Sequence, residues 1–479
     1  MKFNLVCFIV LPVVLCATAI RSGALQAVQP TPLSSQSTSQ STGPAAETAG
    51  ATYEELGRQV VADLAARHFD KVCAQFDEKV SAALPLDKLA EGWDSLLAQA
   101  GDFVSIEKSW EKERREFHVV HVITVFRKTR LDTIVTFDAQ KRIAGLHFVP
   151  AETTPAWQPP AYAKPESFHE REVTVGSSPW QLPGTLTLPN GAGPFPAVVL
   201  VHGSGPHDRD ESIGPNKPFK DLAWGLASRG IAVLRYEKRT RIYPQEMAHL
   251  GSLTVNDETV DDARKAVDVL AAQPEIEAKH IFVLGHSLGG YVGPRIASGD
   301  PKVAGLIIMA GSTRPMEQLV VEQVRYLATL DGKITPEGQE QIDEVEKLKA
   351  AVEDPNLKPG MTVNFLGAPI PASYFLDLRS YHAPELAASL HLPIYVLQGG
   401  RDYQVGAADF EGWKKALAAQ PTASFKLYPA LNHLFMAGEG QSSAAEYEKP
   451  NHVLEAVVQD AAEWVRQKSQ AVMPEKRGK

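Results

Sequence analysis

One hexapeptide in the middle of the chain restricts the possible fold more than any other feature. The apolar run Ile281–Leu284 ends at Gly-His-Ser-Leu-Gly-Gly, which places Ser287 between glycines. These glycines permit a sharp backbone bend, so that the serine hydroxyl projects from the end of a strand and a helix begins directly behind it. The pattern predicts a nucleophilic serine on an α/β scaffold. The alternative is a tight strand-to-helix turn without a chemical role.

A serine hydroxyl is a weak nucleophile, so covalent catalysis also needs a base, an acid that orients the base, and donors for an oxyanion. Two later segments supply candidates, each after an apolar run typical of a buried parallel strand. Asp402 follows Leu392–Leu397 and two glycines, and His433 follows Phe425–Pro429. Because the carboxyl ends of parallel strands face one crevice, we expect Ser287, Asp402 and His433 to meet there.

Other residues compete for these roles. Asp409 is the nearest rival of Asp402. The histidines that compete with His433 are His382, His391 and His452. His391 precedes the strand that leads to Asp402 and therefore lies at its wrong end, whereas the other two have helical surroundings. The spacing favours His433 as the base.

A fourth motif, His-Gly-Ser-Gly-Pro, follows the apolar run Phe195–Val201. The four motifs in this order resemble the α/β-hydrolase superfamily over about residues 183–468. The decapeptide His202–Glu211 is similar to bacterial esterases that carry an extra N-terminal domain. The resemblance implies an α/β-hydrolase fold, a mostly parallel sheet flanked by helices with a helical cap. It also implies the backbone N–H groups of Ser204 and Leu288 as oxyanion donors.

These features lead us to expect a serine carboxylesterase that hydrolyses short to medium acyl esters through an acyl-enzyme, without a cofactor or metal. The fold and the triad do not select the leaving group, so an aminopeptidase-like serine peptidase or a thioesterase is an alternative. A binding protein that kept the scaffold without the chemistry is the alternative from another class.

Two charged segments have open interpretations. Residues 208–211 (Asp-Arg-Asp-Glu), with His202 and His207, could form half of a metal site, but the mixture with arginine favours a polar loop with internal ion pairs. The segment Tyr236–Arg241 replaces a glycine-rich loop of many relatives. Its cationic residues could bind an acidic substrate group, although a solvated loop is the simpler interpretation: Lys238, Arg239 and Arg241.

About eighty residues separate the apolar run Val303–Met309 from the strand before Asp402, more than a crossover needs. They predict a cap at about residues 312–390, with helices over Arg314–Leu330 and Gln339–Val352. We expect four apolar cap residues to cover the acyl group of the substrate: Met361, Phe365, Tyr374 and Phe375.

Residues 51–150 predict a separate small α+β domain that resembles NTF2-like domains. The expected helices and strands are Tyr53–His68, Leu86–Leu97, Val119–Phe126 and Leu131–Phe137. A proline-rich linker at 151–167 separates this domain from the hydrolase domain at 168–470.

The N-terminus, residues 1–19, reads as a signal peptide. Lys2 precedes the apolar stretch Leu5–Val14, which is too short to span a bilayer, and a small-residue Ala-Thr-Ala site follows. We therefore expect export to the periplasm or the medium and no stable membrane insertion. Leu15 is bulkier than the residue that lipoprotein processing prefers, so we do not expect a lipid anchor on Cys16.

Composition limits the partners. With 479 residues, 44% hydrophobic and 22% charged, the chain can bury two cores, while residues 20–50 are polar and small and predict a disordered linker. The formal net charge of -9 argues against nucleic acid and anionic membranes as partners. A small-molecule ester remains the expected partner, and the sequence leaves the oligomeric state open.

Overall fold

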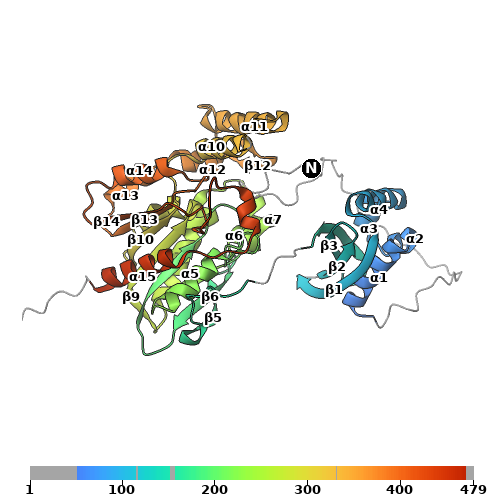
Figure 1. Cartoon of the computed structure of the whole chain (residues 1–479), viewed down its shortest axis with the longest axis horizontal. Helices are drawn as coiled ribbons and strands as arrows, with labels where there is room; N and C mark the ends of the chain where they lie inside the picture. The colour runs from blue at the N-terminus through green and yellow to red at the C-terminus, as the bar shows by residue number, and fades with distance from the viewer. Residues whose placement is uncertain (1–50, 115–116, 152–156, 331, 471–479) are drawn as a thin grey trace, which may run out of the picture. The chain divides into compact units, whose positions relative to one another are not determined.

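The computed structural model describes residues 51–114, 117–151, 157–330 and 332–470 (Figure 1). The chain divides into two compact units, an N-terminal one that ends at Thr154 and one that begins at Pro155, and we describe each by itself. The predicted signal peptide (1–19) and disordered linker (20–50) lie outside the described residues.

The N-terminal unit packs helices on one antiparallel sheet with the strand order β1-β2-β3-β4. Its elements are α1 (Tyr53–Ala65), α2 (Phe69–Cys73), α3 (Glu78–Ala83), α4 (Leu86–Ala100), β1 (Phe103–Arg114), β2 (Phe117–Phe126), β3 (Arg130–Phe137) and β4 (Ile143–Pro150). Val60 and Leu64 of α1 are buried in one core with Val120 and Val122 of β2. The α+β prediction is confirmed, and the arrangement fits an NTF2-like domain.

The second unit contains an eight-stranded sheet with the order β14-β13-β10-β9-β7-β8-β6-β5. Its strands are β5 (Phe168–Val175), β6 (Leu182–Pro189), β7 (Phe195–Val201), β8 (Ala232–Tyr236), β9 (Ile276–His286), β10 (Val303–Met309), β13 (Ile394–Gly399) and β14 (Ala423–Tyr428). The neighbours from β14 to β8 are parallel, and β6 pairs antiparallel with β8 and β5. The predicted α/β-hydrolase fold is confirmed.

Helices cover both faces of this sheet because successive residues of its buried strands point to opposite sides. In β7, Val198 and Leu200 belong to the core under α5 (Pro218–Ala227) and α15 (Glu455–Gln470), whereas Val199 belongs to the opposite core. That opposite core is formed with α8 (Asp261–Ala271), α9 (Leu288–Ala297), α13 (Ala383–Ser389) and α14 (Ala407–Ala416). Shorter helical segments are η2 (Pro165–Ser167), α6 (Arg239–Ile242), α7 (Pro244–Ala248), the π-helical η3 (Asn256–Val260) and η4 (Ala444–Glu448).

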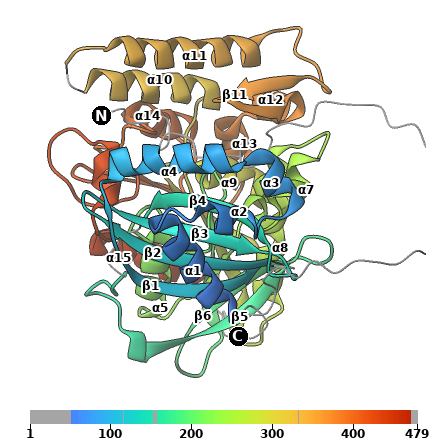
Figure 2. The same cartoon turned by 90° about the vertical axis from the view of Figure 1, so that its right-hand side faces the viewer.

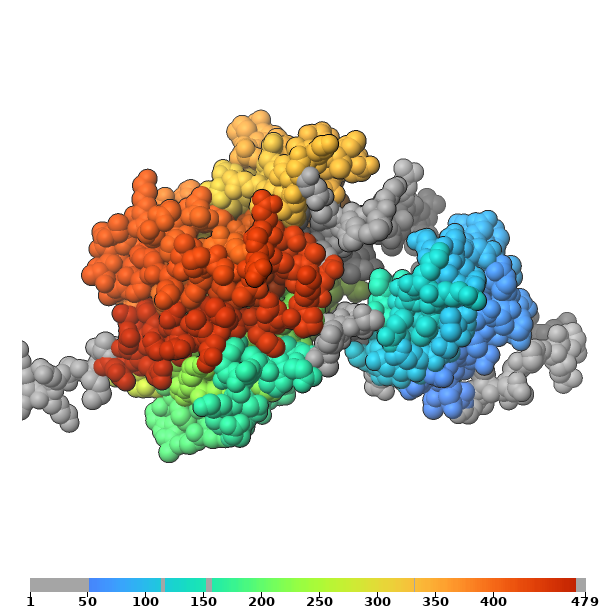
Figure 3. Space-filling model, viewed as in Figure 1, coloured from blue at the N-terminus to red at the C-terminus, as the bar shows by residue number. Residues whose placement is uncertain are grey.

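The predicted cap consists of helices and a hairpin between β10 and β13. Its elements before α13 are α10 (Met316–Thr329), α11 (Pro336–Glu353), β11 (Thr362–Phe365), β12 (Ala368–Pro371) and α12 (Ala372–Arg379). Figure 2 shows α10 and α11 side by side, and in the space-filling view their yellow and orange atoms cover one end of the hydrolase unit (Figure 3). The hairpin was not predicted, because its strands have only four residues each.

Candidate active site

Ser287 occupies the sharp turn between β9 and α9. Its backbone has φ 52° and ψ -115°, a left-handed region that non-glycine residues rarely adopt. A Cβ on Gly285 would lie 2.1 Å from Gly289 O, and one on Gly289 would lie 2.2 Å from Val201 O. Both glycines are therefore required by space, which explains their spacing around the serine. The side chain of Ser287 is partly accessible.

Asp402 and His433 form a buried pair beyond the ends of β13 and β14. The His433 Nδ1 atom lies 2.7 Å from Asp402 Oδ2. The other carboxylate oxygen accepts hydrogen bonds from the N–H groups of Gln404 (2.8 Å) and Val405 (3.0 Å). An ionised carboxylate held this way accepts the Nδ1 proton, which leaves Nε2 of His433 free to accept one.

The rival residues are engaged elsewhere. Asp409 is buried and accepts hydrogen bonds from Arg314 and Thr313. His452 lies 3.1 Å from the carboxylate of Asp221, a residue of α5. His382 and His391 are exposed. The structure therefore pairs His433 with Asp402, whereas Asp409 pairs with Arg314.

Two contacts connect the sharp turn at Ser287, which we call the elbow, to neighbouring loops. His286, which precedes Ser287, donates from Nε2 to the carbonyl oxygen of His433 at 3.0 Å, and the two rings lie 4.7 Å apart. On the other side, a Cβ on Gly203 would lie 3.2 Å from the Ser287 Cβ. Because β7 and β9 are adjacent parallel strands, the loop after β7 packs directly against the serine.

The two expected oxyanion donors have backbone N–H groups that remain available. Leu288 is the first residue of α9, and the first N–H groups of a helix have no intrahelical acceptor. Within the described part of the chain, the Ser204 N–H donates no hydrogen bond, while the Ser204 carbonyl accepts one from His207 Nε2 at 2.6 Å. The positive end of the α9 dipole also favours negative charge at this place.

Sequence reasoning missed the buried ion pair of Glu211 and His286. The Glu211 Oε2 atom lies 3.0 Å from His286 Nδ1, and Oε1 accepts the Gly203 N–H at 2.7 Å. Burial alone would raise the pKa of Glu211, but His286 holds that pKa at about 2. Burial alone would lower the pKa of His286, but the Glu211 carboxylate raises it above its usual value. The pair therefore links the loop after β7 to the end of β9, directly before Ser287.

We expect Glu211→Gln to destabilise the hydrolase unit by about 3–5 kcal/mol, since it removes one partner of a buried pair while keeping the oxygen that accepts the Gly203 N–H. Because the pKa of His286 is raised in the folded state, the pair stabilises the fold fully below the unfolded pKa of about 6.5. This stabilisation is lost as the pH rises through the folded pKa. The lowered pKa of Glu211 preserves the contribution down to acidic pH.

Urea unfolding of both proteins between about pH 5 and 9 checks this expectation. The gap in the free energy of unfolding should be widest at about pH 5–6 and should narrow toward pH 9. A gap that stays constant over the whole range would contradict a charged His286.

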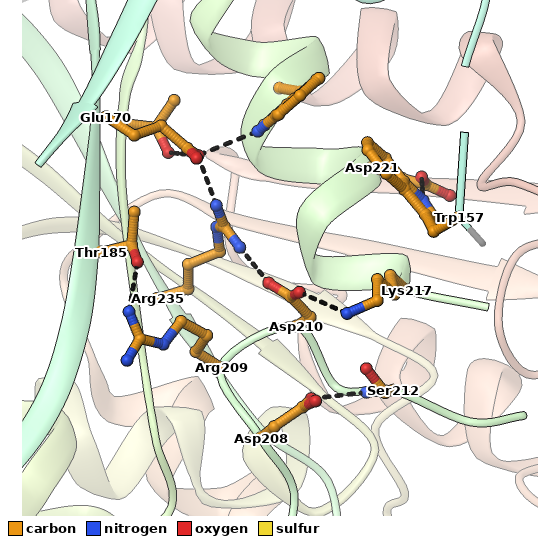
Figure 4. Close-up of polar contacts among 12 residues, drawn as sticks. Trp157, Glu170, Thr185, Asp208, Arg209, Asp210, Ser212, Lys217, Asp221 and Arg235 are labelled. Carbon is orange, nitrogen blue, oxygen red and sulfur yellow. Dashed lines mark hydrogen bonds and ion pairs between the residues drawn. The ribbon is translucent and has the colours of Figure 1, made fainter. Parts of the chain in front are cut away.

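The polar loop at residues 208–211 is held by ion pairs, but the predicted pairing within the loop was wrong. Arg209 contacts Glu172 and Glu237, and Asp210 lies between Arg235 and Lys217 (Figure 4). The partners come from β5, the segment after β8, β8 itself and the start of α5. Tertiary contacts with the sheet, and not local pairing, therefore fix the loop beside the serine.

The interpretation of Lys238 and Arg239 as solvated was also wrong. Lys238 is 2% exposed and donates to Glu258 Oε1 at 2.6 Å, and Arg239 donates to Asp262 Oδ2 at 2.9 Å. Arg241 alone is exposed. Their carboxylate partners lie about twenty residues further along the chain, so local sequence gave no sign of burial.

Three of the four expected cap residues lie together in the interior. Phe375 contacts the rings of Phe365 and Tyr374, with centroids 5.9 and 5.7 Å apart. Met361 is 47% exposed and stands apart from them. The Tyr374 hydroxyl donates to Glu258 at 2.6 Å, so its polar end is already engaged. Contact of these residues with an acyl group stays a prediction.

The described residues contain no group of three or more His, Cys, Asp or Glu side chains positioned to hold a metal ion. Nor does any helix in the described ranges combine the length and apolarity needed to cross a membrane.

The sheet, its flanking helices and the turn at Ser287 place this protein in the class of α/β-hydrolases. Residues 193–441 match the family described as serine aminopeptidase, S33, and residues 58–146 match a family described as protein of unknown function (DUF3887). The chain is 39% identical over 405 residues to esterase EstD of Thermotoga maritima, covering 85% of this chain and 93% of that protein. The chain therefore belongs to the serine aminopeptidase S33 family and is a hydrolase.

Solved structures match the chain at low sequence identity. Est1E from Butyrivibrio proteoclasticus is 14% identical, with 62% of this chain and 99% of that chain covered and a TM-score of 0.40. A Mycobacterium tuberculosis puromycin-hydrolyzing peptidase is 17% identical, with 76% of this chain and 48% of that chain covered and a TM-score of 0.41.

Proposed function

We propose that the protein is a serine carboxylesterase with Ser287 as nucleophile, His433 as base and Asp402 as the acid that orients it. The observation that carries this proposal is the 2.7 Å contact between Asp402 Oδ2 and His433 Nδ1. The backbone of His433 is also hydrogen-bonded to His286, the residue before Ser287. Similarity to an esterase over 85% of the chain supports esters as the substrate class.

The mechanism has two steps. Ser287 attacks the ester carbonyl while His433 Nε2 accepts its proton, and the N–H groups of Ser204 and Leu288 bind the oxyanion. His433 then protonates the leaving alcohol. In the second step a water molecule, deprotonated by His433, attacks the acyl-enzyme. The bond to the Ser287 oxygen then breaks, His433 returns the proton to that oxygen, and the carboxylic acid is released. Asp402 stabilises the imidazolium that forms in both steps.

A substrate panel tests the ester assignment. We expect the wild-type protein to hydrolyse nitrophenyl esters of short to medium acyl chains, because the rings of the cap residues Phe365, Tyr374 and Phe375 already pack against one another in the core. A sharp optimum at long chains would contradict the size preference. Turnover of amino-acid arylamides or thioesters above that of esters would replace the carboxylesterase by a peptidase or a thioesterase.

Labelling with a fluorophosphonate separates an enzyme from a binding protein on the same scaffold. The wild-type protein should be labelled at Ser287, because only an activated serine attacks this reagent at a useful rate. An unlabelled wild-type protein would remove the enzyme assignment. We also propose that the chain is exported, which N-terminal sequencing of the protein from its producing cells checks.

A further inference from the structure

The buried ammonium group of Lys238 contacts the peptide group that the proposed oxyanion hole uses. Lys238 Nζ donates to the Gly203 carbonyl oxygen at 2.7 Å and to Glu258 Oε1 at 2.6 Å. The Gly203 carbonyl and the Ser204 N–H belong to one planar peptide unit with delocalised electrons. A cation on the oxygen therefore withdraws electron density from the nitrogen and strengthens its N–H as a donor.

We propose that Lys238 is a positioning residue of the oxyanion hole: its ammonium group orients and polarises the Gly203–Ser204 peptide, so that the Ser204 N–H binds the developing oxyanion more strongly. This inference rests on the proposed function. No covalent step involves Lys238, which acts through the peptide and does not touch the substrate.

Other contacts of the loop also hold this peptide. The Gly203 N–H donates to Glu211 Oε1 at 2.7 Å, so the peptides on both sides of Gly203 are held. The Lys238 backbone N–H donates to the His207 carbonyl at 3.2 Å, and His207 Nε2 in turn bonds the Ser204 carbonyl. Lys238 thus contacts the loop at both of its ends.

The charge of Lys238 is balanced inside the hydrolase unit. Glu258 is 4% exposed, and its second carboxylate oxygen accepts the hydroxyl of Tyr374 at 2.6 Å. Glu258 lies in the π-helical segment η3, a type of element often found at functional sites. The contacts therefore run from α12 of the cap through Glu258 and Lys238 to the Gly203–Ser204 peptide.

A buried ion pair needs a reason beyond stability, because apolar residues of the same volume often stabilise a fold equally well. The neighbouring pair of Arg239 and Asp262 shows the contrast. It is equally buried, yet among the described residues its guanidinium donates only to Asp262 and does not contact the loop at 202–207. The Lys238 pair differs from it in touching the Gly203 carbonyl.

The test compares two charge-neutral double variants of the full chain. Lys238→Met with Glu258→Gln removes the ammonium and its counterion together, and Arg239→Met with Asp262→Asn is the matched control. The readouts are kcat and KM for a nitrophenyl ester, the inhibition constant of a trifluoromethyl ketone, and the urea midpoint of unfolding. The ketone forms a serine adduct whose oxyanion occupies the hole.

We expect the Lys238 variant to lose roughly 10–100-fold in kcat, less than the 10²–10³-fold typical of deleting a donor, with KM nearly unchanged. Affinity for the ketone should fall by a similar factor. The Arg239 control should keep both values while losing comparable stability. Unchanged kcat and ketone affinity in the Lys238 variant, or an equal loss in the control, would overturn the inference.

A second variant guards against a failure to fold. Lys238→Gln with Glu258→Gln places two amides that can bond each other, and it carries the same expectation because the positive charge is absent. If the wild-type protein hydrolyses no ester, the proposed function fails. The inference then remains testable through the rate at which a fluorophosphonate labels Ser287, because the phosphoryl oxygen gains negative charge in that reaction and would occupy the same hole.

Discussion

Ser287→Ala should reduce kcat for nitrophenyl esters by about a millionfold, down to a residual rate from binding and the oxyanion donors. The substitution removes only the hydroxyl oxygen that attacks the carbonyl. The backbone of the turn should persist, because the Ser287 N–H bonds the Met309 carbonyl at 2.9 Å and the Ser287 carbonyl accepts the Tyr291 N–H. Stopped-flow and long-term assays of purified protein measure the loss.

Ser212→Ala is the matched control. Its hydroxyl lies in the loop that follows the His-Gly-Ser-Gly-Pro motif and has no hydrogen-bond partner among the described residues. This variant should keep wild-type turnover and fluorophosphonate labelling, and Ser287→Ala should lose both while retaining the wild-type unfolding midpoint. A Ser287→Ala protein that still turns over the ester or binds the label would refute the assignment of the nucleophile.

Asp402→Asn should lower kcat by about ten-thousandfold with a small change in KM. The reason lies in the contacts of the carboxylate. Oδ1 accepts two backbone N–H groups, so an asparagine would place its oxygen there and turn its NH2 toward His433 Nδ1. His433 would then accept at Nδ1 and carry its proton on Nε2, the tautomer that cannot take the proton of Ser287.

Asp409→Asn tests the alternative assignment of the acid. The side chain of Asp409 is as buried as that of Asp402, but its carboxylate contacts Arg314, so the change should reduce stability and leave kcat within a few-fold. Measuring the pH dependence of kcat/KM and the melting temperature for both variants separates the two effects. If Asp409→Asn abolished turnover and Asp402→Asn did not, the acid would have to be reassigned.

The parallel strands were predictable because strands buried on both faces consist of apolar runs, as in Val303–Met309, where prediction and structure agree at both ends. The first strand of the N-terminal unit, β1, was not predicted. Its apolar residues do not alternate regularly with polar ones, and none of its residues from Phe103 to Lys112 is fully buried. A strand that forms mainly through pairing with its neighbour, and not through burial of apolar residues, is difficult to predict from a sequence.

The sequence by itself predicted the residues that we propose for catalysis and their order: a serine between obligatory glycines, then an aspartate, then a histidine, each after an apolar run. These signals are local, since a bend needs nearby glycines and a buried strand needs consecutive apolar residues. Only the tertiary structure showed that His433 contacts Asp402 while Asp409 contacts Arg314, that Lys238 is buried, and that Glu211 pairs with His286. Partners of buried charges come from distant segments, and only the folded sheet brings them within hydrogen-bond distance.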